Sequence, residues 1–336
     1  MKKFCLPLLF LIFLADINAH AYSPEGFSKF IRQTKSLARS QGVSNKTIEE
    51  SFRNMKFNYK VVAQDNKQPE RKTAGTATIK TAGFQKYKAK IVTDSRVAEG
   101  KKLLEANYDM LEKIERTYGV EKEVLVALWG VESNYGRVEG NFNLIQSLAS
   151  LAYEGRRREF FTTELINALK IIDQKQIHAK DFKGSWAGAF GQVQFMPSTF
   201  LKYAVDFDGD GRKDLWNNKF DALASAANYL HNIGWEHGMG WGGKRVILTK
   251  NINHQYLNKE YKLSYIKWRE QGVKLYNGGN LPNLPNLASV IDPDGNEVGS
   301  FKEVYIVSDN FRRIMEWNRS TYFATSIGLI ADSIKR

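Results

Sequence analysis

The chain has 336 residues, a formal net charge of +13 at pH 7 and one cysteine, Cys5, in its first few residues. Beyond that position it has no thiol, which excludes thiol catalysis, thiolate metal sites and disulfide bonds in the rest of the chain. The length is ample for an ordinary hydrophobic core, and the excess of positive charge favours anionic partners.

The first 21 residues have the pattern of a secretory signal peptide. Two lysines follow Met1, residues 4–15 form an apolar run, and Ala19-His20-Ala21 fits the small-x-small cleavage pattern. The run is too short for a stable membrane anchor. We therefore expect cleavage after Ala21 and a periplasmic or secreted protein. Export argues against nucleic acid as the anionic partner and favours polymers of the cell envelope.

Apolar residues at helical spacing dominate the chain. The pattern predicts helices within 22–60, 97–118, 120–131, 144–152, 160–172, from Pro197 onward, 221–233 and 311–334. The polar stretch 64–83 predicts a loop or insertion. Short apolar runs at 246–248, 287–291 and 304–307, with a turn signal at 292–296, predict a small antiparallel β element at about 245–310. The fold class predicted is α+β, mainly helical.

A carboxylate near the end of an apolar helix is the first candidate for chemistry. Glu132 follows the buried run 124–131, and the helix is expected to stop near Gly136. Partial burial disfavours the charged form of a carboxyl group and raises its pKa, as a general acid requires. Taken alone, the position fits an exposed glutamate at a helix end better, so Glu132 by itself does not indicate an enzyme.

The loop 184–198 combines glycines, aromatic residues and amides. Its polar side chains offer neutral donors and acceptors for sugar hydroxyl groups, and its aromatic side chains offer flat faces for pyranose rings. The polar ones are Ser185, Gln192 and Gln194, and the aromatic ones are Trp186, Phe190 and Phe195. The alternative is a tightly packed loop whose aromatic residues belong to the core.

The order of several motifs resembles the lytic murein transglycosylase B family. The motifs are residues 132–136, 156–161, 187–198, 206–211, 227–235, 310–311 and 317–320. The likeness extends from about residue 25 to the C-terminus. It implies a lysozyme-like core at 119–336 and a helical N-terminal part at 22–118. Three features depart from the family: Trp317 stands where tyrosine is usual, 73–83 looks like an insertion, and no lipidation cysteine is present.

The resemblance also implies a mechanism with one carboxyl group. Glu132 would protonate the glycosidic oxygen between N-acetylmuramic acid and N-acetylglucosamine. As a carboxylate it would then take the proton of the C6 hydroxyl group, which closes a 1,6-anhydro ring. Peptidoglycan glycan strands would be the partner of a monomer that needs no organic cofactor. The implied substrate contacts are Ser185 and Asn318 for the acetamido group, Gln194, Tyr229 and Tyr322 for the sugar subsites, and Arg156 and Arg157 for peptide-stem or lactyl carboxylates.

An aspartate-rich stretch matches the start of a calcium-binding loop. Asp206, Asp208 and Asp210 stand at positions 1, 3 and 5, with glycine at position 6 and the Arg212 carbonyl group at position 7. Position 12 is asparagine rather than the usual glutamate, and the resemblance suggests that Asp221 closes the site instead. We therefore expect a structural Ca²⁺ ion, with an aspartate-rich turn that holds no ion as the alternative.

Three other functions fit parts of the pattern. A muramidase that delivers water would use a second carboxylate as base, and Glu139 and Asp173 are the candidates. A non-catalytic peptidoglycan-binding protein would have lost the acid, yet Glu132 is present. An exported polyanion-binding module would show basic stripes with interleaved aromatic residues, whereas the lysines here are scattered.

Overall fold

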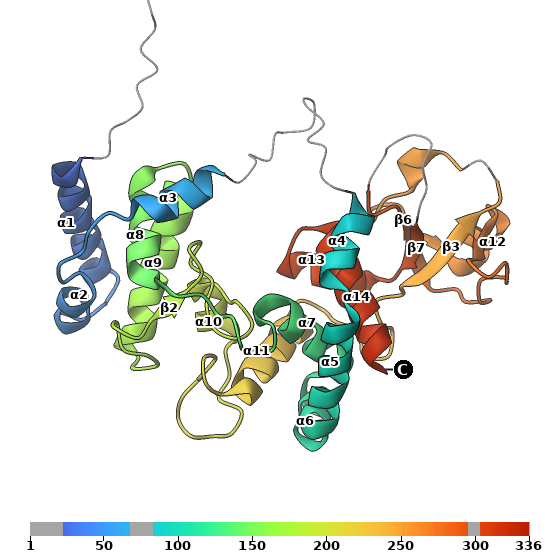
Figure 1. Ribbon diagram of the computed structural model, residues 1–336, viewed down its shortest axis with the longest axis horizontal. Helices are drawn as coiled ribbons and strands as arrows, with labels where there is room; N and C mark the ends of the chain where they lie inside the picture. The colour runs from blue at the N-terminus through green and yellow to red at the C-terminus, as the bar shows by residue number, and fades with distance from the viewer. Residues whose placement is uncertain (1–22, 68–82, 251, 295–302, 336) are drawn as a thin grey trace, which may run out of the picture.

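The computed structural model describes residues 23–67, 83–250, 252–294 and 303–335. The predicted signal peptide, most of the predicted insertion and the end of the 292–296 turn lie outside the described residues. The described chain is mainly helical and carries two antiparallel sheets, so the predicted fold class is confirmed (Figure 1). Among the described helices, none combines the length and the apolarity that a membrane crossing requires.

The first three helices pack on a helical hairpin from the middle of the chain. α1 (Pro24–Ser40), α2 (Asn45–Ser51) and α3 (Tyr59–Asn66) contact α8 (Leu144–Glu154) or α9 (Arg158–Asp173). The hydroxyl groups of Ser23 and Ser44 cap α1 and α2, and the rings of Phe27 and Phe30 lie 5.3 and 5.7 Å from that of Tyr153. These contacts form one end of the molecule in Figure 1.

The next three helices pack elsewhere, on the elements around Glu132. α4 (Phe84–Ile91) contacts α14 (Thr321–Lys335), and α5 (Asp94–Ala106) contacts both α14 and α7 (Lys122–Ser133). α6 (Tyr108–Tyr118) packs on α11 (Lys219–Asn232). The two groups of helices, α1–α3 and α4–α6, therefore contact different parts of the chain.

The larger sheet has five antiparallel strands in the order β4-β6-β7-β3-β5. Their bounds are β3 (Lys244–Leu248), β4 (Leu263–Ser264), β5 (Val273–Leu275), β6 (Leu287–Ile291) and β7 (Val304–Val307). In register, Val290 faces Ile306 and Val246 faces Val304. These residues form a small core of their own together with Trp268 of α12 (Tyr265–Glu270). The three predicted strands are confirmed.

A separate two-stranded sheet, a helix that follows the larger sheet and a 3-10 turn complete the described elements. β1 (Phe142–Asn143) pairs with β2 (Lys183–Gly184), ahead of α10 (Pro197–Tyr203). After β7, α13 (Asp309–Trp317) returns to the core and ends beside α7. A 3-10 turn, η1 (His254–Tyr256), lies in the loop after β3.

Three details of the predicted elements were wrong. Residues 64–66 belong to α3 and not to a loop. The predicted helix 97–118 is divided at Asn107, whose side chain donates to the Leu103 carbonyl group and competes with helix continuation. The helix at 311–334 is divided at 318–320, where Asn318 takes an extended conformation.

Candidate active site

Glu132 lies in the last turn of α7, after seven consecutive buried residues. The left-handed conformations of Asn134, Tyr135 and Gly136 end the helix there, with φ angles of 50°, 61° and 79°. Burial raises the pKa of Glu132 to about 7, and a hydrogen bond from Trp317 opposes part of this rise. A carboxyl group with this pKa exists in both the protonated and the ionised form near neutral pH.

The turn behind Glu132 is held by Ser133 and Gln192. The Ser133 hydroxyl group donates to the Gln192 carbonyl oxygen at 2.5 Å, and it accepts from the Gly136 amide at 2.9 Å. The Gln192 side chain accepts from the Trp129 indole at 3.0 Å. A Cβ atom at Gly136 would lie only 2.7 Å from the Gln192 amide oxygen, so this position requires glycine. The sequence assigned Gln192 to sugar binding, whereas the structure uses it to brace the helix end.

Trp317 supplies the one hydrogen bond that the described structure gives the Glu132 carboxyl group. Its indole N–H group donates to Glu132 Oε1 at 2.8 Å, across 185 residues of sequence. An indole can only donate, so this contact stabilises the carboxylate form and fixes one carboxyl oxygen. The sequence identified Trp317 as a departure from its family but gave no indication of this contact.

Aromatic rings continue from Trp317 along one wall of the site. The ring of Trp317 lies 5.2 Å from Tyr229 of α11 and 5.4 Å from Phe195, and Tyr229 lies 5.0 Å from Tyr203. Burial raises the pKa of Tyr229 to about 12, so its hydroxyl group stays protonated. The structure thus places the predicted subsite residue Tyr229 one side chain away from Glu132.

Tyr87, on α4, is close enough to Glu132 for the charge of that carboxylate to act on its phenol group. Burial raises the pKa of the Tyr87 phenol, and the charge of Glu132 adds to that rise. The ring of Tyr87 lies 5.6 Å from that of Tyr322, a predicted subsite residue on α14. The Tyr322 hydroxyl group donates to Asp294 at 2.5 Å, so its ring is held against α4. Sequence reasoning missed Tyr87, because α4 is short, rich in lysine and was not predicted.

The remaining predicted sugar contacts lie on loops beside these walls. Asn318 directly follows Trp317 and is exposed. Ser185 shapes the loop after β2, since its hydroxyl group accepts from the Ala189 amide at 3.0 Å. Gln194 has a φ angle of 50°, and its side-chain amide donates to the carbonyl oxygens of Gly191 and Glu139. The three side chains thus come from two loops that flank the aromatic wall.

Two aromatic residues expected to form sugar-binding faces are core residues. Phe190 is fully buried and stacks on Trp216 with ring centroids 5.0 Å apart and planes at 9°. Phe195 is 3% exposed and supports Trp317 from behind. The small and apolar neighbours that suggested a ligand surface serve instead to pack this loop, whereas Trp186 remains partly exposed.

Arg156 and Arg157 have a partner within the chain. Both guanidinium groups bind the carboxylate of Asp65, which lies on α3 and has a side chain only 1% exposed. Arg156 Nε lies 3.0 Å from Asp65 Oδ2, and Arg157 Nη2 lies 2.9 Å from Oδ1. Both arginine side chains remain partly exposed, and their assignment to peptide-stem or lactyl carboxylates stays a prediction. They anchor α3 to the turn between α8 and α9, because a buried carboxylate requires such partners.

The two carboxylates considered as a second base have different surroundings. Asp173 accepts from the hydroxyl groups of Ser44 and Thr47, which lower its pKa and tie the end of α9 to α2. Burial raises the pKa of Glu139 to about 7, and the charge of Asp214 adds to the rise. The backbone carbonyl oxygen of Glu139 accepts a hydrogen bond from the Gln194 side-chain amide. Of the two, Glu139 is the one beside the predicted subsites.

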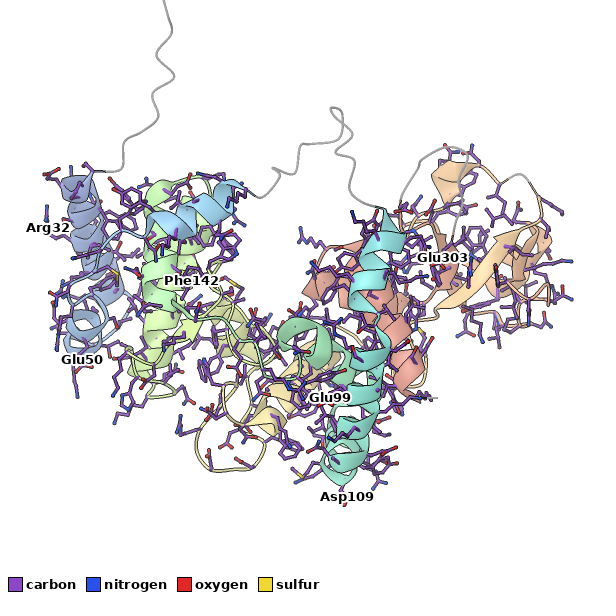
Figure 2. The ribbon with its side chains drawn as sticks, in the orientation of Figure 1. Arg32, Glu50, Glu99, Asp109, Phe142 and Glu303 are labelled. Atoms are coloured by element: carbon purple, nitrogen blue, oxygen red, sulfur yellow. The ribbon has the colours of Figure 1, made fainter. Side chains whose placement is uncertain are left out.

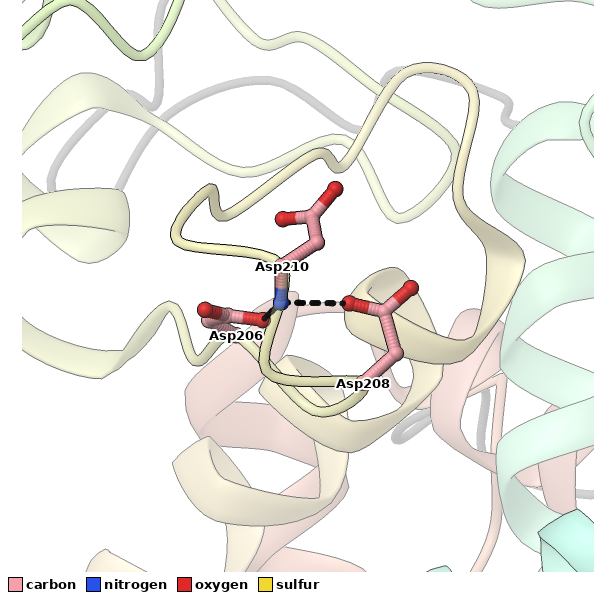
Figure 3. Close-up of side chains that lie close together, drawn as sticks. All are labelled: Asp206, Asp208 and Asp210. Carbon is pink, nitrogen blue, oxygen red and sulfur yellow. Dashed lines mark hydrogen bonds between the residues drawn. The ribbon is translucent and has the colours of Figure 1, made fainter.

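The aspartate-rich loop gathers three carboxylates. Oxygens of Asp206, Asp208 and Asp210 lie within 4.8 Å of one another (Figure 3). Asp206 also accepts from the amides of Gly209, Asp210 and Gly211 at 2.7–3.1 Å. Hard oxygen donors at this separation fit a calcium ion. The donor set therefore agrees with the cation that the sequence predicts.

Asp221 and Arg212 do not join this cluster of carboxylates. Asp221 is fully buried, and its two oxygens accept from the amides of Phe207 and Asp214 at 2.8 and 2.9 Å. Asp221 thus closes the loop by hydrogen bonds and is not one of the three clustered aspartates, and its role as a calcium ligand stays a prediction. The Arg212 amide donates to Asp210, and a role for the Arg212 carbonyl group stays a prediction.

These features together define a class of protein. A single partly buried carboxyl group at the end of an apolar helix, with one indole donor and aromatic walls, is suited to acid catalysis on a glycosidic bond. A profile described as a transglycosylase SLT domain matches residues 26–332, which is most of the chain. The protein therefore belongs to the transglycosylase SLT family, and the predicted family is confirmed.

Individual relatives agree with this assignment. Membrane-bound lytic murein transglycosylase B of Escherichia coli K12 is 32% identical over 254 residues, which cover 74% of this chain and 66% of that protein, just under two thirds of its length. The crystal structure of SltB3 from Pseudomonas aeruginosa in complex with NAG-NAM-pentapeptide has a TM-score of 0.84 and 38% identity, with 92% of this chain and 79% of that chain covered. The Escherichia coli lytic transglycosylase Slt35 in complex with calcium has a TM-score of 0.73 and 28% identity, with 92% of each chain covered.

Proposed function

We propose that this protein is a peptidoglycan lytic transglycosylase. It would cleave the β-1,4 bond between N-acetylmuramic acid and N-acetylglucosamine and form a 1,6-anhydro-muramoyl end. The observation that carries this proposal is the Glu132 carboxyl group, which burial holds at a pKa of about 7 and which has one hydrogen-bond donor among the described residues, Trp317. Membership of the transglycosylase SLT family supports it.

The proposed reaction uses Glu132 twice. The protonated carboxyl group donates to the glycosidic oxygen, so the bond to the muramoyl C1 atom breaks and the N-acetylglucosamine side leaves as an alcohol. The resulting carboxylate then accepts the proton of the muramoyl C6 hydroxyl group while that oxygen bonds to C1. A pKa of about 7 suits both steps, because neither form is scarce near neutral pH. No water is consumed.

The surrounding side chains would position the substrate. We assign Ser185 and Asn318 to the acetamido group, and Gln194, Tyr229 and Tyr322 to the sugar subsites. In support, Tyr229 packs on Trp317, and the Trp317 indole donates to Glu132. Tyr322 packs on Tyr87, and burial together with the charge of Glu132 raises the pKa of Tyr87. Exposed Asn318 directly follows Trp317.

Mass spectrometry of digested sacculi tests the proposal. The wild type should release muropeptides with anhydro ends, and Glu132→Gln should release none while it remains folded and still binds sacculi. Reducing muramoyl ends from the wild type would instead identify a muramidase. The raised pKa of Glu139, also about 7, is the observation that favours this second candidate. Glu139 lies beside Gln194, whose side-chain amide donates to the Glu139 carbonyl oxygen. Glu139→Gln should leave a transglycosylase active and inactivate a muramidase that uses Glu139 as its base.

We also propose a structural calcium ion in the loop at 206–211. The three clustered aspartates support it, and the relative Slt35 was solved in complex with calcium. Asp206, Asp208 and Asp210 would hold the ion, which neutralises their mutual repulsion and fixes the loop ahead of α11. The ion would take no part in proton transfer.

Finally, we propose that the chain is exported and acts in the periplasm or outside the cell. The signal-peptide pattern of residues 1–21 and a substrate of the cell wall support this location. N-terminal sequencing of the mature protein should begin at Tyr22. Recovery of an uncleaved chain that only detergent extracts would contradict the proposal.

A further inference from the structure

A cavity of about 750 Å³ lies away from Glu132, between the end of α2, the start of α8 and the loop after α9. Figure 2 labels Glu50 of α2, one of the residues that line this cavity. Its volume is typical of an organic ligand site and far larger than an inorganic ion requires. None of the residues assigned to catalysis or to the sugar subsites lines it.

The rim of the cavity carries an excess of positive charge. Lys46, Arg53, Lys175 and Lys180 line it and are exposed, and within the part of the chain that the structure describes none of the four forms an ion pair. Two carboxylates, those of Glu50 and Asp173, also line the cavity. The four cations therefore exceed the carboxylates by two charges, and they are distributed around the rim.

The lining of the cavity also includes apolar side chains and two buried hydroxyl groups, those of Ser51 and Thr47. Met55, Ile172, Ile177 and Ala179 contribute apolar surface, of which Ile172 is 8% exposed. Ser51 also lines the cavity and is 8% exposed, and its hydroxyl group has no hydrogen-bond partner among the described residues. A buried hydroxyl group without a partner is costly, so a ligand that supplies one would recover that free energy.

We propose that this cavity binds the peptide stem of peptidoglycan, an inference that rests on the proposed function. A stem carries alanyl methyl groups, several separated carboxylates and the amine of its diamino acid. The apolar side chains suit the methyl groups, the distributed cations suit the carboxylates, and Glu50 and Asp173 suit the amine. A compact phosphate group would leave most of the cavity and its apolar side chains without a contact.

The pairing of β1 with β2 connects the cavity to the catalytic region. Asn143 of β1 lines the cavity and pairs with Lys183 of β2, and Ser185, one of the proposed glycan contacts, directly follows β2. A stem held in the cavity would therefore lie on the far side of the β1–β2 pair from the glycan. The cavity gives the enzyme a means to prefer peptide-bearing strands over naked glycan.

Calorimetric titration with a free sugarless stem pentapeptide tests the proposal on the full-length protein. The wild type should bind it, and the double variant Lys46→Gln/Lys180→Gln should bind at least about tenfold more weakly, because two charge-assisted contacts are lost. The matched control Lys102→Gln/Lys267→Gln removes the same charge from exposed residues outside the cavity and should bind as the wild type does. Equal affinity of the two double variants would overturn the proposal.

Two further measurements test the contact with Ser51 and distinguish a peptide ligand from phosphate. Ser51→Ala should weaken peptide binding without lowering the melting temperature, because it removes a hydroxyl group that has no partner in the described structure. Unchanged affinity in Ser51→Ala would exclude the Ser51 contact and overturn the proposal as stated. Inorganic phosphate at matched ionic strength should not displace the peptide, and phosphate binding that depends on Lys46 and Lys180 without peptide binding would also overturn it.

Activity assays keep this proposal distinct from the proposed function. Lys46→Gln/Lys180→Gln should cleave intact sacculi more slowly than the wild type but cleave amidase-treated glycan, which lacks stems, at the wild-type rate. Glu132→Gln should cleave neither. Failure of the wild type to cleave either substrate would refute the proposed function, whereas equal slowing of the double variant on both substrates would refute only the stem site.

Discussion

The carboxyl groups of Glu132, at the end of α7, and of Asp206, in the loop at 206–211, have pKa values shifted in opposite directions. Burial raises the pKa of Glu132 to about 7, and one indole donor only partly opposes it. For Asp206, three backbone amides outweigh the effect of burial and hold the pKa of its carboxyl group below the ordinary value. Deep burial with one donor therefore favours the protonated form of Glu132, whereas slight burial with three backbone donors favours the ionised form of Asp206.

The largest effect should follow from removal of the proton carrier. Glu132→Gln keeps the shape of the side chain but can neither donate nor accept the proton, so the cleavage rate should fall by at least roughly 10². Turnover of purified sacculi measures this rate, with circular dichroism as the control for folding. Near wild-type activity in Glu132→Gln would show that Glu132 of α7 does not carry the proton.

The acidic loop should affect stability rather than proton transfer. Calcium at a hundredfold excess over its Kd would stabilise the native state by about 2.7 kcal/mol, and EDTA should reverse the effect. Asp208→Ala or Asp210→Ala should abolish the response, whereas Asp181→Ala, a change at an exposed aspartate elsewhere, should keep it. Differential scanning calorimetry measures the shift. If millimolar calcium leaves the melting temperature unchanged, the loop is a turn without an ion.

Asp65 presents a third environment, buried like Glu132 but paired with two arginines. Asp65→Asn should destabilise the fold by about 2 kcal/mol, since it leaves two partly buried guanidinium groups without their counter-charge. Arg156→Gln should likewise lower stability and leave the KM for glycan unchanged. Urea titration and steady-state kinetics separate the two outcomes. A raised KM at unchanged stability would support the substrate role that the sequence suggested.

A smaller effect should follow from loss of the indole donor. Trp317→Phe keeps a ring but removes the hydrogen bond that lowers the pKa of Glu132, so that pKa should rise above about 7. Because the general acid must be protonated, the alkaline limb of kcat/KM should move to higher pH, with a loss of about tenfold or less at the optimum. Trp186→Phe, which changes an indole on another loop, should not move that limb. An unshifted profile in Trp317→Phe would mean that the indole does not act on Glu132.

Local patterns made much of this fold predictable. The apolar run before Glu132 was enough to predict a buried helix and an acid at its end, and the β-rich runs predicted three strands of the sheet. Both signals arise from residues adjacent in sequence, because side-chain periodicity reports one buried face. The ordered motifs then identified the family, which no single residue could have done.

The contacts that define the site were not predictable in the same way. Trp317 reaches Glu132 across 185 residues, and Arg156 reaches Asp65 across 91, so both depend on the tertiary path of the chain. An arginine pair gives the same sequence signal whether its carboxylate belongs to the substrate or to a distant helix. Tyr87 was missed because its eight-residue helix is too short and too polar to show a clear periodicity.

The central claim, that burial keeps Glu132 available as both acid and base, is tested most directly by its titration. Carbon-13 NMR of protein labelled at glutamate carboxyl groups, with Glu132→Gln as the assignment control, reports the protonation of this one side chain. The account predicts a resonance that titrates with a midpoint near 7 and is absent from the variant. A midpoint near the ordinary value of 4.5 would contradict the account, because the carboxyl group would then be almost fully ionised at neutral pH.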